Sequence, residues 1–304
     1  MTPSREQELA VLKSVTYAAL FDYPLTLDQL HAGLVGMHTT PRTLLAWWES
    51  SEFLQAHVER QDGWFFPAGR ADLIDVRVRR EDVSRKLLAR DGGILRLIAS
   101  LPFVRMVALS GSLAHLNAEG SADLDLFVIT APGRVWSVTV TALVIAKLVG
   151  VRRHLCMNYV LSERAMTIEP QDLFSANQII HLRPTFGGCV FESFVRSNAF
   201  VRVFYPNFEL PAVDAAPRRG FKTAVEYALS LGPAQLAERI SRAMYGWHLR
   251  RRSASWQSRE QVRLEPECLK LHSSSHRMAT IERFEAAMQA ATAKTTKDLN
   301  VLAS

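Results

Sequence analysis

The chain has 304 residues, 48% of them apolar and 22% charged, which is ordinary for a globular protein and sufficient for two or three domains. Its net charge of +6 and pI near 9.4 suit an acidic partner such as a nucleotide or nucleic acid, although charge alone identifies none. The three cysteines, Cys156, Cys189 and Cys268, are too few and too far apart for a disulfide scaffold or a cysteine-based zinc site. They indicate reduced thiols.

The first twenty residues lack the basic start, continuous apolar core and small-residue cleavage site of a secretory signal. The most apolar stretch, residues 135–151, is short for a membrane span and contains Lys147, so it predicts a buried helix. We therefore expect a cytoplasmic protein without a membrane partner.

Residues 1–70 are predicted to form a domain of three helices and a hairpin. Apolar positions recur at helical spacing over residues 5–21, and Thr26 is suited to cap a second helix. A third helix is expected after Thr40, with Pro41 at its first position. Extended pieces over 53–59 and 63–67, joined by residues 60–62, complete the pattern. This order of elements resembles a winged helix.

Winged helices commonly contact DNA through their third helix, but residues 41–50 offer one cation, Arg42, and also carry Glu49. DNA binding is therefore the less favoured use, and a packing or interaction role is preferred. Residues 71–99 are predicted to form a linker helix rich in arginine. Its basic face is either solvated or leans over a cleft to neutralise the phosphates of a nucleotide.

The most specific pattern lies in residues 106–130. An apolar run ends at Ser110, Gly111 and Ser112, and ten residues later a second run begins with Asp123 and Asp125 alternating with leucines. Strand alternation places the two carboxylates on one side, which a fold tolerates when a cation lies between them or water reaches both. Gly111 permits close backbone approach to a phosphate, whose oxygens the neighbouring hydroxyls and amides can bind at a helix N-terminus.

A Gly-Ser turn followed by such an Asp-apolar-Asp strand resembles the signature of the polymerase-β-like nucleotidyltransferase superfamily. The resemblance spans residues 95–165 and rests on Gly111, Ser112, Asp123 and Asp125. A chance occurrence is disfavoured because the acids lie within a strand pattern. The resemblance implies an α/β (α+β) core with a small mixed sheet over residues 100–208. In such a core the acids hold two Mg²⁺ (or Mn²⁺) ions and the turn grips the triphosphate of an NTP, whose NMP passes to an acceptor hydroxyl.

The family pattern has a third carboxylate on the next core strand. Here a predicted helix over 134–148 leads to a strand over 155–161 whose central polar residue is Asn158. Asparagine can ligate a metal but cannot take a proton. Either Glu163 or Glu169 supplies the base, or the protein is a catalytically impaired nucleotide sensor that acts through the winged helix.

Helices are also predicted over 171–182 and 189–203, and His181 and Arg183 are weaker candidates for ligand contact. Residues 209–304 are expected to form a C-terminal helical region, with helices over 222–248 and 260–293. The three arginines at 250–252 lie beside Trp247 and Trp256, a combination that more often ends an amphipathic helix than holds single-stranded nucleic acid. His272 and His276 have helical metal-site spacing without supporting ligands.

The acceptor is not specified by any motif. A small molecule or a protein is preferred over RNA, because the basic residues are scattered and no aromatic platform stands out. A plain winged-helix transcription regulator is the least favoured alternative, since it leaves the Asp-x-Asp strand without a role.

Overall fold

The computed structural model describes residues 2–120, 122–213, 219–258, 262–271 and 276–302. Residues 2–67, here called the N-terminal unit, form a three-stranded antiparallel sheet of order β1-β3-β2 packed against helices. Its elements are α1 (Arg5–Ala19), β1 (Leu25–Thr26), α2 (Leu27–Ala32), α3 (Pro41–Ser50), α4 (Glu52–His57), β2 (Val58–Gln61) and β3 (Trp64–Pro67). The predicted caps Thr26 and Thr40 both accept a backbone hydrogen bond in the first turn of their helices.

Two details of the N-terminal unit differ from the prediction. Residues 52–57 are helical rather than extended, because Ser51 caps this turn by accepting a hydrogen bond from the Leu54 amide. The hairpin turn lies at Asp62 and Gly63, which both have positive φ, so β2 extends two residues beyond the predicted strand end.

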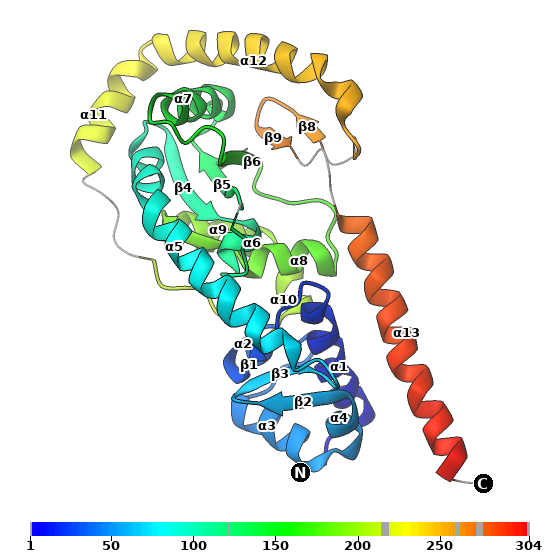
Figure 1. Ribbon diagram of the computed structural model, residues 1–304. Coiled ribbons are helices and arrows are strands. Elements are labelled where there is room, and N and C mark those ends of the chain that lie inside the picture. The colour runs from blue at the N-terminus through cyan, green and yellow to red at the C-terminus, as the bar shows by residue number, and fades with distance from the viewer. Residues whose placement is uncertain (1, 121, 214–218, 259–261, 272–275, 303–304) are drawn as a thin grey trace.

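The predicted linker helix is present as α5 (Asp72–Ser100). It runs from the N-terminal unit to the central sheet, where its second half packs (Figure 1). Side chains from α5 therefore contact both parts of the molecule.

The central sheet has six strands in the order β7-β4-β5-β6-β9-β8. Its strands are β4 (Val104–Leu109), β5 (Leu124–Thr130), β6 (Leu155–Ser162), β7 (Arg183–Phe186), β8 (Val262–Leu264) and β9 (Cys268–Leu271). The β5–β6 pair is parallel and the other pairs are antiparallel. The expectation of an α/β chain with a mixed sheet and C-terminal helices is thus confirmed.

Alternating residues of the strands build two apolar cores, one on each sheet face. One face is covered by α5, α7 (Val135–Leu148) and α12 (Pro233–Arg251), with Trp136 fully buried. The opposite face is covered by α8 (Leu173–Ile180), α9 (Gly188–Ser197) and α10 (Phe200–Phe204). The short α6 (Gly111–Ala114) follows β4, and α11 (Arg219–Ser230) precedes α12.

Three predicted helices were wrong in extent, and one of them, 222–248, is divided at Gly232 into α11 and α12. The segment 189–203 is interrupted at Asn198, whose buried amide bonds the Met166 and Phe194 carbonyls and the Ile168 amide. Within the described part of 260–293, the strands β8 and β9 precede α13 (Arg277–Leu302), and β9 pairs with β6 in the central sheet. Burial in that sheet outweighs local helix preference.

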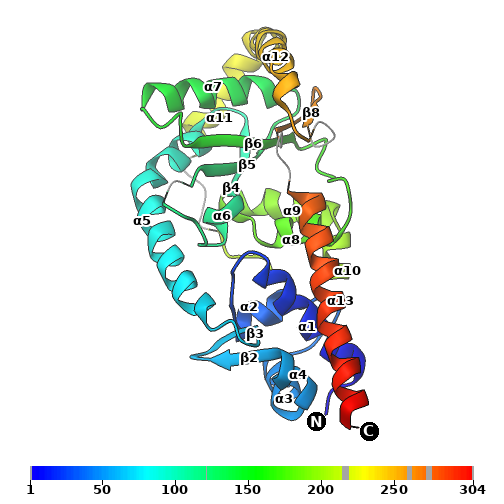
Figure 2. The same ribbon diagram turned by 45° about the vertical axis from the view of Figure 1, so that its right-hand side comes forward.

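The last helix, α13, returns along the molecule to the N-terminal unit and lies beside α1 (Figure 2). The rings of Tyr17 and Phe284 meet edge to face with centroids 5.3 Å apart. Across the described residues, no helix has the length and apolar character needed to cross a membrane.

Candidate active site

The Gly-Ser turn follows the last residue of β4. The Ser110 amide donates a 2.9 Å hydrogen bond to the Asp125 carbonyl, which fixes the turn against β5. Gly111 has φ of +65°, and a Cβ at this position would collide with Oδ2 of Asp125. Glycine is therefore required both for the left-handed backbone and for the approach of the carboxylate. Ser112 is exposed beside it.

Both acids were predicted to lie in one strand, but β5 begins at Leu124, so only Asp125 lies within it and Asp123 immediately precedes it. Asp123 is exposed just before the strand, whereas Asp125 is half-buried within it. Burial raises the pKa of the Asp125 carboxyl to about 6, the nearby charge of Asp123 adds to this, and a hydrogen bond from Asn158 opposes it. The arrangement is electrostatically unfavourable without a counter-charge.

Asn158 occupies the position on β6 that faces Asp125. Its Nδ2 donates to Oδ1 of Asp125 at 2.5 Å. The register between the strands shifts here, since Asp125 pairs with Cys156 but Phe127 pairs with Tyr159. Such a bulge redirects side chains. It allows both Asn158 and Tyr159 to line the same cavity as Asp125.

The alternative bases, Glu163 and Glu169, do not line this cavity. Glu163 is five residues beyond Asn158, about 16 Å along an extended strand, and pairs with Arg105 instead. The Cys156 thiol donates to Asp123 at 3.5 Å, and burial together with that carboxylate raises its pKa to about 12. This thiol is therefore protonated and unsuited to act as a nucleophile.

A cavity of about 160 Å³, here called the sheet cavity, collects these groups. Ser110, Gly111, Asp125 and Asn158 line one side of it, and α8 lines the other with Phe174, Ser175 and Gln178. Two cations from the C-terminal region, Lys270 and Arg277, also line the cavity. The Asp125 carboxylate, the start of the Gly-Ser turn and two cations thus surround one space, whereas Asp123 and Ser112 do not line it.

Sequence reasoning missed Lys270 and Arg277 because residues 260–293 were predicted as one helix. Lys270 lies on β9 opposite Tyr159, is 8% exposed, and burial lowers the pKa of its ammonium group. Arg277 forms an ion pair with Asp172, the N-cap of α8. The signal that could have revealed the strand was the short apolar run Cys268–Leu271, which is interrupted only by Lys270.

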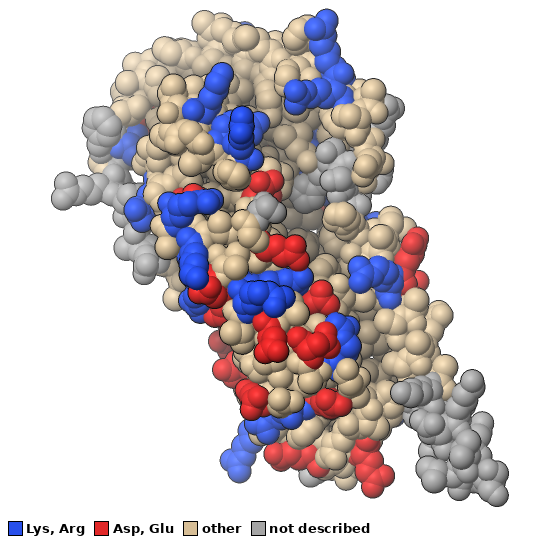
Figure 3. All heavy atoms as spheres, viewed as in Figure 1, with Lys and Arg blue, Asp and Glu red and all other residues tan. Residues whose placement is uncertain are grey.

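The arginines of α5 bind groups of the protein itself and do not take the predicted role of neutralising nucleotide phosphates. Arg77 is 2% exposed and donates to the Leu116 carbonyl at 2.6 Å, while Arg80 bonds Glu119. Further along α5, Arg85 and Lys86 pair with acids one turn earlier. Basic and acidic side chains are interspersed on the face in Figure 3. None of these α5 cations lines the sheet cavity.

Other predicted candidates are dispersed. His181 lies at the end of α8 and lines a second cavity, where the N-terminal unit meets the core, whereas Arg183 is exposed on β7. Arg251 stacks on Trp247 at the end of α12, in line with the preferred helix-end interpretation. His272 lies outside the described residues, so the His272–His276 hypothesis is untested.

The described residues contain no cluster of three or more His, Cys, Asp or Glu side chains able to hold a metal. Asp123, Asp125 and the Asn158 amide are an oxygen donor set of the kind that Mg²⁺ uses when substrate phosphates complete its shell.

No protein-family model, curated protein or solved structure matches this chain.

Proposed function

We propose that this protein is a nucleotidyltransferase that moves an NMP from an NTP to a hydroxyl group of an acceptor. The observation that carries the proposal is the direct packing of the Gly111 turn on the Asp125 carboxylate, in a cavity that also contains Lys270. A phosphate-binding backbone and acidic metal ligands are needed together for this reaction, and few other activities require both.

In this proposal the residues of the sheet cavity, together with Ser112 and Asp123 outside its lining, divide into two groups. The amides and hydroxyls of Ser110, Gly111 and Ser112 bind the terminal phosphates, and Lys270 and Arg277 neutralise their charge. Asp123 and Asp125 hold Mg²⁺ or Mn²⁺, which supplies charge neutralisation when bound with the nucleotide. Burial first, and the charge of Asp123 second, raise the pKa of Asp125, and a bound cation would offset both effects on the carboxylate, which supports a cation at this place.

The acceptor oxygen forms a bond to the α-phosphorus while the bond to the bridging oxygen breaks, so pyrophosphate leaves. The acceptor hydroxyl gives up its proton to solvent water as this bond forms. Asn158 cannot accept it, and the fixed donation of its amide to Asp125 instead orients that carboxylate. We expect a small molecule or a protein as acceptor.

The same proposal includes the finer fold assignments. The core from β4 to β6 has the strand, turn, short helix and strand order of a polymerase-β-like nucleotidyltransferase. The N-terminal unit has the helix and hairpin order of a winged helix. Three unpaired cysteines support a cytoplasmic location.

A second candidate function is favoured by one observation, the amide of Asn158 in the place of a third carboxylate. A site of this kind can bind nucleotide and metal without turnover. The protein would then be a sensor whose bound state is relayed through the N-terminal unit.

The test is incubation of the full chain with each α-labelled NTP, Mg²⁺ or Mn²⁺, and cell extract. A transferase places label in one acceptor and releases pyrophosphate, and Asp123→Ala/Asp125→Ala abolishes both. Asp82→Ala, an exposed acid of α5, is the matched control and retains activity. Nucleotide binding that depends on both acids, without label transfer, would support the sensor, and absence of any nucleotide binding would refute both functions.

A further inference from the structure

The outer face of α12 carries a row of exposed apolar side chains. Leu236, Ile240, Met244 and Trp247 are between 48% and 68% exposed. They recur at spacings of three and four residues, so they lie on one side of the helix. This row, here called the α12 stripe, is about 17 Å long at 1.5 Å per residue. Single exposed apolar residues are common, but a continuous row of four indicates a surface that meets a partner.

The inner face of α12 packs on the core, so the helix cannot rotate to bury the stripe. Ala234 is buried, and the ring of Tyr245 meets the ring of Trp136 with centroids 6.4 Å apart. Glu238 accepts hydrogen bonds from the amides of Trp136 and Ser137 at 3.0 and 2.8 Å, at the start of α7. These contacts fix the rotation of α12 and keep the stripe on the outside.

The exposed charges beside the stripe are positive. Four exposed arginines flank the stripe or lie at its end: Arg239, Arg242, Arg250 and Arg251. The one acid of the described helix α12 is Glu238, which also accepts from the Ser137 hydroxyl and so faces α7. Glu226 of α11 is paired with Arg105. The surface around the stripe is therefore complementary to an anionic partner.

The position of α12 leaves this surface accessible. The helix runs across one end of the molecule, opposite the N-terminal unit, in both ribbon views (Figure 1, Figure 2). In the space-filling view this end shows Lys and Arg side chains, and the Asp and Glu side chains lie below it (Figure 3). A broad, flat surface can therefore approach α12 without meeting the N-terminal unit.

The combination of apolar and positive side chains distinguishes between three classes of partner. A nucleic acid would pair with the arginines but would leave Leu236, Ile240 and Met244 in water. A second copy of the chain would cover these side chains but would bring the like charges of two α12 helices together. An anionic lipid surface suits both, because arginines bind the head groups while apolar side chains enter the acyl boundary.

We propose that α12 docks this protein on an anionic lipid surface, with the α12 stripe in the acyl boundary and Arg239 and Arg251 at the head groups. The indole of Trp247 suits the interface because it is apolar and carries one N–H group. The guanidinium of Arg251 lies 4.0 Å from the centroid of this indole, which holds a cation at the edge of the stripe.

The proposal extends the sequence-based expectation about membranes. We expected no membrane partner because the most apolar segment is too short to span a bilayer, and a helix that lies in the interface needs no such segment. Docking through α12 also goes beyond nucleotidyl transfer and does not rest on it, since none of the residues of the α12 stripe lines the sheet cavity.

The experiment is sedimentation of the full chain with vesicles of phosphatidylcholine, either alone or with about a third of phosphatidylglycerol. We expect binding to the anionic vesicles only, and weaker binding at high salt because salt screens the arginines. Ile240→Asn/Met244→Asn should weaken binding about tenfold or more, since two apolar side chains are lost from the stripe. Val78→Asn/Val203→Asn, which changes exposed residues of α5 and α10, is the matched control and should bind like the wild type.

A second pair of variants tests the contribution of charge. Arg239→Gln/Arg251→Gln should weaken binding to the anionic vesicles about 30-fold, because each cation at such a surface contributes roughly fivefold. Arg79→Gln/Arg96→Gln removes two exposed cations from α5 and should leave binding unchanged. All four variants change exposed side chains, so we expect each to keep the Tm of the wild type.

Several outcomes would overturn the proposal. The wild type does not sediment with anionic vesicles, or Ile240→Asn/Met244→Asn binds them as well as the wild type does, in which case charge alone explains binding. A wild-type dimer that this variant loses in light scattering would assign the stripe to a second copy of the chain. Binding of a single-stranded oligonucleotide that depends on Arg239 and Arg251, without vesicle binding, would assign the surface to nucleic acid.

Discussion

Replacing Asp125 with asparagine is expected to stabilise the metal-free protein at neutral pH. The pKa of this carboxyl rises from 3.8 to about 6 on folding, first because of burial and second because of Asp123. A shift of about two units corresponds to roughly 3 kcal/mol, at 1.36 kcal/mol per unit. This value is the upper limit of the gain in the free energy of unfolding that we expect for Asp125→Asn, because the amide has nearly the same shape as the carboxyl and never ionises.

The pH dependence follows from the direction of the shift. Between pH 4 and 6 the folded state binds more protons at Asp125 than the unfolded state, so the stability of the wild type falls as pH rises through this window. Below pH 4 the carboxyl is neutral in both states, and the variant has little advantage. The advantage of Asp125→Asn therefore grows from pH 4 to 6 and is complete above it.

Urea unfolding in EDTA at pH 4 and pH 7.5 measures the effect, with the slope m checked to be constant. Asp123→Asn is the control variant, because it removes only the charge of Asp123 and leaves the Asp125 carboxylate buried. We expect it to raise the free energy of unfolding at pH 7.5 by less than Asp125→Asn does. Equal or lower stability of Asp125→Asn at pH 7.5 would show that the carboxylate is well accommodated, and the electrostatic reasoning would fail. Added Mg²⁺ should stabilise the wild type but not the variant.

Three further outcomes are expected. Gly111 and Gly133 both have φ of +65°, so an alanine at either position lowers the free energy of unfolding by about 1–2 kcal/mol through backbone strain. Only Gly111→Ala also meets the Asp125 carboxylate, and urea unfolding should show a further loss of about 1–3 kcal/mol for this variant. Equal losses for the two variants would show that the close approach of Asp125 has no energetic effect. Lys270→Met should weaken Mg²⁺-ATP binding about 10- to 100-fold in calorimetry without lowering Tm, because a charged hydrogen bond to phosphate contributes roughly 1.5–3 kcal/mol. An unchanged affinity for Mg²⁺-ATP would show that Lys270 does not contact the phosphates. Fluorescence anisotropy with duplex DNA should show no strongly salt-dependent binding, because Arg42 is the sole cation on the described helix α3. A DNA affinity that falls about a thousandfold between 50 and 200 mM salt would contradict the expectation that α3 does not bind DNA.

The sequence by itself determined the features that depend on neighbouring residues. Capping residues such as Thr26 and Thr40, the apolar runs of β4 and β5, and the glycine between them all act within a few residues of the chain. The alternation around Asp125 therefore sufficed to predict a strand that carries this carboxylate, with Asp123 near enough for its charge to act on it. Asn158 was predicted in the same way, from its central place in a short apolar strand.

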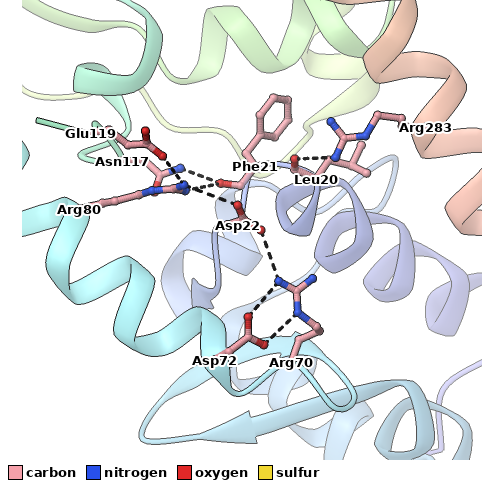
Figure 4. A network of polar contacts seen from close by, with 9 residues as sticks. All are labelled: Leu20, Phe21, Asp22, Arg70, Asp72, Arg80, Asn117, Glu119 and Arg283. Carbon is pink, nitrogen blue, oxygen red and sulfur yellow. Dashed lines mark hydrogen bonds and ion pairs between the residues drawn. The ribbon is translucent and has the colours of Figure 1, made fainter. Parts of the chain in front are cut away.

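Only the tertiary structure decided which distant segments meet. Lys270 reaches the sheet cavity because β9 pairs with β6, a strand more than a hundred positions earlier in the chain, and this pairing buries Cys268 and Leu269. The N-terminal unit and the core meet through contacts such as the hydrogen bond from Nδ2 of Asn117 to the Phe21 carbonyl, 96 positions apart in the chain (Figure 4). Whether the Tyr17 hydroxyl finds a partner is a property of that packing, because the same tyrosine on a solvated helix face would simply bond water.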